Sequence, residues 1–353
     1  MKTILCSVML AVMSLVVASV NAAEHQRDIL VLTSTNNPGG NEVAVFKLEA
    51  MGAPSLSLVN MLATGGDGGA STNAGSLQFG GVFGAVANYG SNSVSQMMRS
   101  DDSISIARTI GLARGCTNPV SVALAENSLF VVGANCAESH AWPWGNVDGA
   151  VVTLHDSSAA QIAVGQSWAA VTLTSGSVLQ LPLNEEGGLN GTSAAVTLPA
   201  DADMVPLGAA FWGDILGFNP AHSPDSFALV DMAGDVFPVV GPTPAFPTNA
   251  PCWLAKGPGS VWYSGNSPGK AISIFFSDGQ GGVFYKSVAL PGAPTDITVS
   301  EDQKWLAVIY TASSDSLARV AVFGIDAYGD LSPVATSDPI GGVAAFNGVA
   351  ISQ

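Results

Sequence analysis

A pattern that recurs about every 44 residues constrains the fold of this 353-residue chain more than any other feature. Seven segments begin with a small or turn-forming residue and continue with an apolar residue at every second position. They are NAGSLQF at 73, NPVSVAL at 118, SAAQIAV at 158, VPLGAAF at 205, APCWLAK at 250, APTDITV at 293 and AFNGVAI at 345. An alternation of period two is typical of strands, and a regular spacing of this length is typical of repeat architectures.

Most intervals between these segments contain three further strand-like runs, separated by Gly, Asn and Asp. Four short antiparallel strands in about 45 residues are the sequence form of a propeller blade. The seventh segment ends the chain after one strand, whereas DILVLTST, NEVAVFKL and SLSLVNMLA precede the first segment. We therefore predict an all-β, seven-bladed β-propeller whose last blade combines one C-terminal strand with three N-terminal strands, which closes the ring.

The second interval is the least regular. LFVVGAN is followed by CAESHAWPWGNVDG and then by AVVTLHD, directly before the third segment. Either the third strand is irregular or the fourth is missing. We favour an irregular third strand around residues 140–144, with Val147-Asp148-Gly149 as the turn into a fourth strand.

The N-terminus predicts export. Lys2 precedes an apolar run from Ile4 to Val20, and Val20-Asn21-Ala22 offers a small-residue cleavage site, so residues 1–22 are predicted to be a signal peptide. Residues 23–353 are then a single propeller domain in a secreted or periplasmic protein. No later apolar run approaches the ~20 residues of a membrane span. The net charge of −16, without a cluster of Lys and Arg, argues against nucleic acid or a membrane surface as partner.

Three stretches carry a resemblance to a known family: GAVANYGSNSVSQMM at 84–98, APCWLAKGPGSVWYSGNSPGKAISIF at 250–275, and PTDITVSEDQKWLAVIYTA with RVAVFGIDAYGDLSPV at 294–334. The chain resembles the lactonase-type seven-bladed propellers, the group around 6-phosphogluconolactonase and fungal carboxymuconate cyclase. The resemblance spans essentially the mature chain and implies a propeller with a ligand site on one face.

Several residues usual in that family are replaced. Pro251-Cys252-Trp253-Leu254 stands where members commonly carry Pro-Arg-His-Leu, so the Arg and the His are both absent. Ser267 aligns with a common glutamate, and Val120 aligns with a common histidine. Asp296 matches the aspartate of the family's Pro-Arg-Asp.

In a four-stranded blade, the loop before the first strand and the loop between the second and third strands open on one face of the ring. We predict that this face holds the site. The candidate catalytic residues are Glu138, His140 and Asp296, and the candidate ligand-binding residues are Asn88, Arg114, Trp142, His222, Asp225, Cys252 and Trp253.

Three cysteines remain after the leader is removed. Cys116 precedes the first strand of blade two and Cys136 follows its second strand, so we predict that they form a disulfide worth roughly 3 kcal/mol. Cys252 is then unpaired. It is either a small apolar residue that lines the channel or a thiolate activated by His140 or His222, and both alternatives stay open.

The segment CAESHAWPWGN is the most distinctive local feature. Glu138 and His140 can perform acid–base chemistry, and Trp142 can stack on a sugar or aromatic ring. The alternative is a rigid loop whose tryptophans pack on the propeller. No motif supports calcium or zinc among these carboxylates and histidines, so we expect no cofactor.

Two functions are consistent with these features. The first is a lactonase-like or lactonizing hydrolase acting on a small lactone or related carboxylate ring, with Arg114 as the anchor for a carboxylate. The second is a non-catalytic, secreted propeller that binds a ligand or protein partner on the same face. We expect a monomer that binds a small lactone or sugar-like ring.

Overall fold

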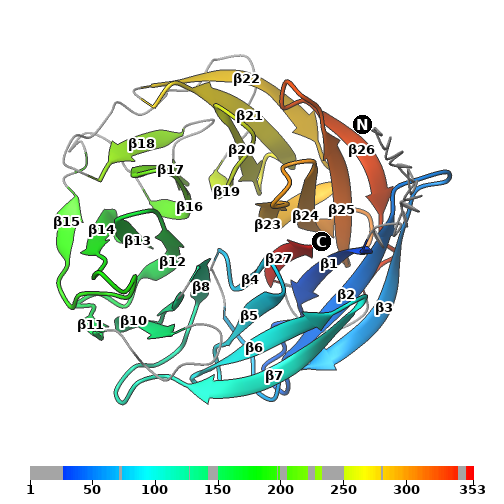
Figure 1. The fold of residues 1–353 in the computed structure, drawn as a ribbon. Coiled ribbons are helices and arrows are strands. Elements are labelled where there is room, and N and C mark those ends of the chain that lie inside the picture. The colour runs from blue at the N-terminus through cyan, green and yellow to red at the C-terminus, as the bar shows by residue number, and fades with distance from the viewer. Residues whose placement is uncertain are drawn as a thin grey trace, which may run out of the picture.

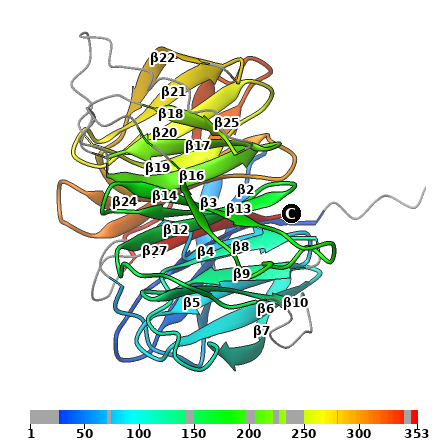
Figure 2. The same ribbon diagram turned by 90° about the vertical axis from the view of Figure 1, so that its left-hand side faces the viewer.

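The computed structural model describes residues 27–70, 74–126, 128–141, 150–196, 198, 205–221, 227–232, 250–279, 281–340 and 347–353. The predicted signal peptide lies outside these residues. The strands form seven antiparallel sheets arranged as the blades of a ring (Figure 1). Seen from the side, the cyan, green and yellow blades lie one above another (Figure 2). Within the ranges described, no helix is long and apolar enough to cross a membrane.

The strands of the first four blades follow one another in chain order from the channel outward. Blade one is β4 (Leu77–Gly80), β5 (Phe83–Asn88), β6 (Ser93–Ser100) and β7 (Ser103–Gly111). Blade two is β8 (Ser121–Ala125), β9 (Ser128–Val132), β10 (Cys136–Ala141) and β11 (Val152–Thr153). Blade three is β12 (Ala159–Val164), β13 (Trp168–Leu173), β14 (Ser177–Pro182) and β15 (Ala194–Val196). The described strands of blade four are β16 (Pro206–Trp212), β17 (Ile215–Pro220) and β18 (Ala228–Asp231).

The remaining blades lie on the other side of the ring. Blade five is β19 (Pro251–Lys256), β20 (Val261–Asn266), β21 (Ala271–Ser277) and β22 (Gly282–Ala289). Blade six is β23 (Gly292–Val299), β24 (Trp305–Ala312), β25 (Ala318–Ile325) and β26 (Leu331–Thr336). Blade seven is β27 (Asn347–Ser352), β1 (Ile29–Ser34), β2 (Glu42–Glu49) and β3 (Ser55–Ala63).

The seven predicted segments supply the innermost strands, and the predicted fold is confirmed. The C-terminal β27 pairs antiparallel with the N-terminal β1, with Leu30 opposite Ser352 and Thr33 opposite Val349. Blade seven therefore joins one C-terminal strand to three N-terminal strands, as the strand count predicted.

The strand layout of blade two differs from the prediction. The third strand begins at Cys136, directly after the turn at residues 134–135, and not around residue 140. Glu138 and His140 therefore lie within a regular strand and not in a loop above the channel. The fourth strand has only two residues, Val152 and Thr153.

The core is divided into one apolar cluster for each contact between neighbouring blades. β9 shows why: Leu129 and Val131 join the cluster with blade one, whereas Phe130 and Val132 join the cluster with blade three. Successive side chains of a strand point to opposite faces of its sheet. A strand in which every residue is apolar can therefore pack against both neighbouring blades.

The innermost strands of blades three to six share an irregularity. Their pairing shifts register after Ala159, Pro206, Pro251 and Pro294, and these are the second residues of the repeated segments. A bulge tolerates proline, which lacks the N–H of a regular ladder, and it re-aims the side chains that follow. The repeat thus encodes the same local bend on the channel wall of four blades.

Arg99 secures the joint of the ring. Its side chain is fully buried in β6, and Nη1 donates to Ser352 Oγ at 3.0 Å while Nη2 donates to the carbonyl of Asp28. Nε donates to the carbonyl of Asp101. One guanidinium therefore binds residues at both ends of the described chain.

Replacement of this residue tests its role at the joint. We expect Arg99→Met to lower the free energy of unfolding by about 2–4 kcal/mol, because buried partners lose charge-assisted hydrogen bonds. Arg319→Met is the control, since Arg319 pairs with Asp315 near the surface and such pairs contribute less than about 1 kcal/mol. Urea unfolding followed by tryptophan fluorescence measures both, and an equal loss in the two variants would contradict the role of Arg99.

Candidate functional site

A cavity of about 230 Å³ lies in the central channel, and all seven blades contribute to its wall. The wall is formed by Gly75, Leu77, Gln78, Ala123, Leu124, Gln161, Ile162, Ala163, Val164, Ala209, Ala210, Phe211, Leu254, Ala255, Lys256, Asp296, Ile297, Thr298, Val299 and Val349. Several of these are the last residues of innermost strands, such as Val164, Lys256 and Val299. The cavity therefore extends toward the end of the channel opposite to the face predicted from the loops.

Asp296 is the one predicted catalytic residue that lines this cavity. Its carboxylate is buried in β23 and accepts hydrogen bonds from the N–H of Gly75 at 3.2 Å, Ile297 at 2.9 Å and Val349. Burial raises the pKa of Asp296 to about 7, although the three N–H donors favour the ionised form. The residue is therefore poised to gain or lose a proton near neutral pH.

Lys256 is the other ionisable residue of the described wall. Its ammonium donates to the carbonyls of Gly257, at 2.8 Å, and Gly259. It also lies 5.2 Å from the ring centroid of Trp212 and 5.3 Å from that of Trp262. Burial lowers the pKa of Lys256 to about 8. The cation is thus held by carbonyls and aromatic faces.

Glu138 and His140 do form a pair, with 2.8 Å between Glu138 Oε1 and His140 Nε2. Both are buried, and Glu138 Oε2 accepts the N–H of Ala113. They lie opposite Val131 and Leu129 of β9, whose side chains belong to the core between blades one and two. Their predicted place above the channel is therefore wrong: the pair sits inside a blade contact, in the third strand from the channel.

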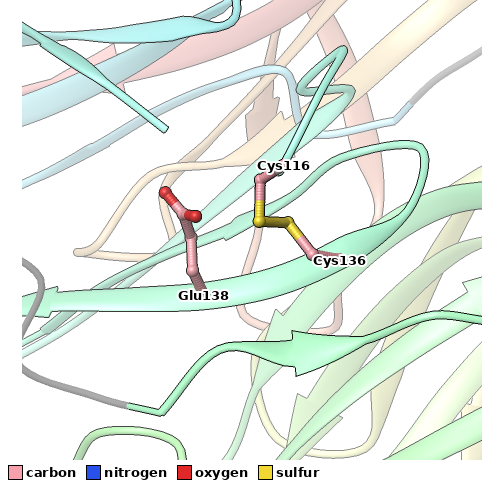
Figure 3. Close-up of side chains that lie close together, drawn as sticks. All are labelled: Cys116, Cys136 and Glu138. Atoms are coloured by element: carbon pink, nitrogen blue, oxygen red, sulfur yellow. A yellow bond between two sulfur atoms is a disulfide. The ribbon is translucent and has the colours of Figure 1, made fainter. Parts of the chain in front are cut away.

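The predicted disulfide between Cys116 and Cys136 is confirmed, with a Cα–Cα distance of 5.6 Å. Glu138 follows Cys136 on the same strand, and its carboxylate approaches the two sulfurs (Figure 3). Both sulfurs are bonded to each other, so the group offers no thiolate to a metal ion in this oxidation state.

Asn88 has a structural environment. Its Oδ1 accepts from Thr64 Oγ1 at 2.8 Å and from Asn41 Nδ2 at 3.1 Å, and its Nδ2 donates to Ser95 Oγ at 2.8 Å and to Ser93 Oγ. The amide uses its full hydrogen-bonding capacity between blades seven and one. This side chain therefore has nothing to offer a ligand.

The remaining predicted residues are dispersed. Arg114 is exposed between β7 and β8, and Trp253 is half-buried against the core between blades five and six. Neither belongs to the cavity wall. Trp142, His222 and Asp225 lie outside the described residues.

Cys252 is the free cysteine of the described residues. It is half-buried in β19 against a small cluster that includes Ala160, Leu207 and Ala221, and its thiol donates to the carbonyl of Ala250. Burial raises the pKa of the thiol to about 11. His140 lies in blade two, so of the two bases considered for its activation only His222 stays untested. These features favour an apolar lining residue over a thiolate nucleophile.

Two amide residues of the wall were not predicted, Gln78 and Gln161. A signal was available for one of them. Gln161 and Asp296 are both the fourth residue of their repeated segments, SAAQ and APTD. An alignment of the repeats would therefore have shown that Gln161 occupies the position equivalent to Asp296.

Comparison with known proteins finds neither a matching family model nor a matching curated protein. Solved structures do match. A periplasmic gluconolactonase from Pseudomonas aeruginosa has a TM-score of 0.66 at 13% identity, over 92% of this chain and 98% of that chain. A candidate 6-phosphogluconolactonase from Bacteroides fragilis has a TM-score of 0.62 at 12% identity, over 89% and 98%. This chain shares the propeller fold of the lactonase-type proteins.

The same fold also occurs with other chemistry. A virginiamycin B lyase from Staphylococcus aureus matches with a TM-score of 0.55 at 15% identity, over 73% of this chain and 80% of that chain. At such identities the likeness concerns the fold, and function has to be derived from the residues of the site.

The raised pKa of Asp296 predicts how stability depends on pH. The pKa in the folded protein, about 7, exceeds the usual 3.8, so the folded state binds this proton more tightly than the unfolded state. Its contribution is fully present below about pH 4 and is lost as pH rises to about 7. We expect the stability of the wild type relative to Asp296→Asn to fall by on the order of 4 kcal/mol across this range. Urea unfolding at a series of pH values measures it, and a constant difference would refute the shift.

Cys252 gives a second prediction. Iodoacetamide at neutral pH should label Cys252 slowly in the folded protein and rapidly after unfolding, because burial keeps the thiol protonated. Cys252→Ala should lower stability by about 1–2 kcal/mol through the small cavity it leaves. Peptide mapping by mass spectrometry identifies the labelled residue, and rapid native labelling would restore the thiolate hypothesis.

Proposed function

We propose that this chain is an exported, lactonase-like propeller that acts on a small lactone or related carboxylate ring in its central channel, with Asp296 as the acid–base group. The observation that carries the proposal is the position of this carboxylate. It is buried on the wall of the cavity, and its pKa of about 7 suits proton transfer at neutral pH. The lactonase-type fold supports the hydrolysis or closure of a lactone ring as the reaction.

The chemistry requires one proton acceptor that later becomes a donor. Ionised Asp296 takes a proton from a water molecule as the water oxygen attacks the ring carbonyl, forming a tetrahedral intermediate. The bond between the carbonyl carbon and the ring oxygen then breaks, and protonated Asp296 returns the proton to that oxygen. Lactone and water give the open hydroxy acid, and the carboxylate is regenerated. The reverse sequence closes a ring.

The cellular location follows from two features. The leader predicted at residues 1–22 directs export, and the disulfide between Cys116 and Cys136 persists in an oxidising compartment. We therefore propose a secreted or periplasmic monomer that acts without a cofactor.

A non-catalytic propeller is the second candidate, and one observation favours it. The Glu138–His140 pair is enclosed between blades one and two, which leaves Asp296 as the carboxylate on the described wall. The family's Arg and His are replaced by Cys252 and Trp253. In this case the cavity binds a small ring without converting it.

Turnover of a lactone panel separates the two candidates. We expect the wild-type protein to hydrolyse at least one small lactone in a pH-stat assay, and Asp296→Asn to reduce the rate by about 100-fold or more. Glu138→Gln is the matched control, because it keeps the acceptor for Ala113 and lies outside the cavity.

Three results would change the proposed function or mechanism. Binding without turnover in the wild type identifies the non-catalytic propeller. Full activity of Asp296→Asn removes that residue from the mechanism. Loss of activity after treatment with EDTA would introduce a metal ion that the proposal does not contain.

A further inference from the structure

Two side-chain amides converge on Gly75, next to Asp296. The position that a Cβ atom would take on Gly75 lies 3.1 Å from Gln161 Nε2 and 3.2 Å from Gln78 Nε2. The N–H of Gly75 itself donates to Asp296 Oδ2 at 3.2 Å. Blades one, three and six therefore bring two amides and one carboxylate to a single point of the cavity wall, where the residue has no side chain to fill the space.

The orientation of Gln161 is fixed by the fold. Its Oε1 accepts the backbone N–H of Ala209 at 2.7 Å, in the innermost strand of blade four. Because the oxygen is used in this bond, the NH₂ group is the end directed toward Gly75. The Gln161 side chain is buried, so its rotamer is held by the surrounding strands.

The two amide nitrogens have hydrogens to donate. In the part of the chain that the structure describes, neither Gln78 Nε2 nor Gln161 Nε2 donates to a protein acceptor. The nearby hydroxyl of Ser121 is already used, since it donates to the carbonyl of Gly75 and accepts the N–H of Ile162. Both side chains line the cavity, so an oxygen atom of water or of a ligand in the cavity is the expected acceptor.

We infer that Gln78 and Gln161 together bind one oxygen of an uncharged, hydroxyl-bearing ligand, while Asp296 accepts a hydroxyl or water proton beside it. Both amide nitrogens lie within 3.2 Å of the Cβ position of Gly75 and so are neighbours, and one carbonyl or ring oxygen placed between them in the cavity can accept from both. The inference rests on the channel site of the proposed function, and it names the class of substrate as a neutral hydroxylated lactone.

Charge selects against anionic ligands at this point. Asp296 is an acid without a cationic partner, and the ammonium of Lys256 is held by two carbonyls and two tryptophan faces. A phosphate or second carboxylate in the cavity would meet no cation on the described wall other than the Lys256 ammonium, which already donates to two carbonyls. Like charges a few ångströms apart repel strongly in a poorly solvated site. Phosphorylated lactones should therefore bind more weakly than neutral ones.

The test measures binding without relying on turnover. The probe is D-glucono-1,5-lactam, which presents the ring carbonyl and hydroxyls of a neutral lactone but resists hydrolysis, and its 6-phosphate is the anionic counterpart. Isothermal titration calorimetry at neutral pH gives both affinities. We expect the neutral lactam to bind on the order of 100-fold more tightly than its phosphate.

Variants assign the two amides. Gln78→Met removes one donor at similar volume, and Gln161→Glu keeps an acceptor for Ala209 while removing the other donor. Each should weaken the binding of the neutral lactam by about tenfold. Gln180→Met is the matched control, because Gln180 lies in β14 outside the cavity wall and donates to the carbonyl of Met232. Circular dichroism confirms that each variant is folded.

The outcomes for recognition and for catalysis are separable. Binding of the neutral lactam that depends on both glutamines, without lactone turnover, supports the inference and removes the proposed hydrolase. Turnover that is unchanged in Gln78→Met and Gln161→Glu overturns the inference and leaves the hydrolase standing. Equal affinity for the phosphate, or no binding of either lactam by the folded wild type, also overturns it.

Discussion

The antiparallel pairing of β1 with β27 is the interaction on which the rest of the structure depends. It joins residues 315 positions apart, as in the hydrogen bond from Thr33 Oγ1 to the carbonyl of Gly348. The entropy lost by closing so long a loop grows only slowly with its length, so a short ladder can offset it when both faces are also packed. Arg99 binds Ser352 beside this ladder, and Asp296 accepts the N–H of Val349 within it. The candidate site is therefore complete only in the closed ring.

The polar groups of the channel have a common structural origin. Ser121, Gln161 and Asp296 are each the fourth residue of a repeated segment, and each accepts a backbone N–H from another blade, at Ile162, Ala209 and Gly75 respectively. The need to satisfy these buried N–H groups explains why polar residues occupy an otherwise apolar wall. The hydrogen-bonding groups left for a ligand are then an NH₂ group on Gln161 and lone pairs on Asp296, whereas the Ser121 hydroxyl has already used its only hydrogen.

The sequence was sufficient for the fold because the blade is a local unit that recurs, and seven copies with a split last blade permit one arrangement. The disulfide was predictable for the same reason, since strand ends of one hairpin must meet. Glu138 and His140 were misplaced because two polar residues in a run rich in tryptophan and proline resemble a loop, whereas their bond to each other lets them enter a buried strand. Gln78 was not predicted because its role depends on Gln161, which belongs to another blade and comes near it only in the folded ring.

The division of the core into separate clusters between blades bears on how such a chain can change over evolutionary time. The clusters contain the apolar side chains of the strands, whereas Ser121, Gln161 and Asp296, each the fourth residue of its repeated segment, bind backbone N–H groups of other blades. Substitutions at these few positions can alter what the channel recognises while the seven clusters keep their packing. The fold can therefore be kept while the ligand chemistry of the channel changes. Related proteins with this construction can therefore lose most of their sequence similarity and still share the fold.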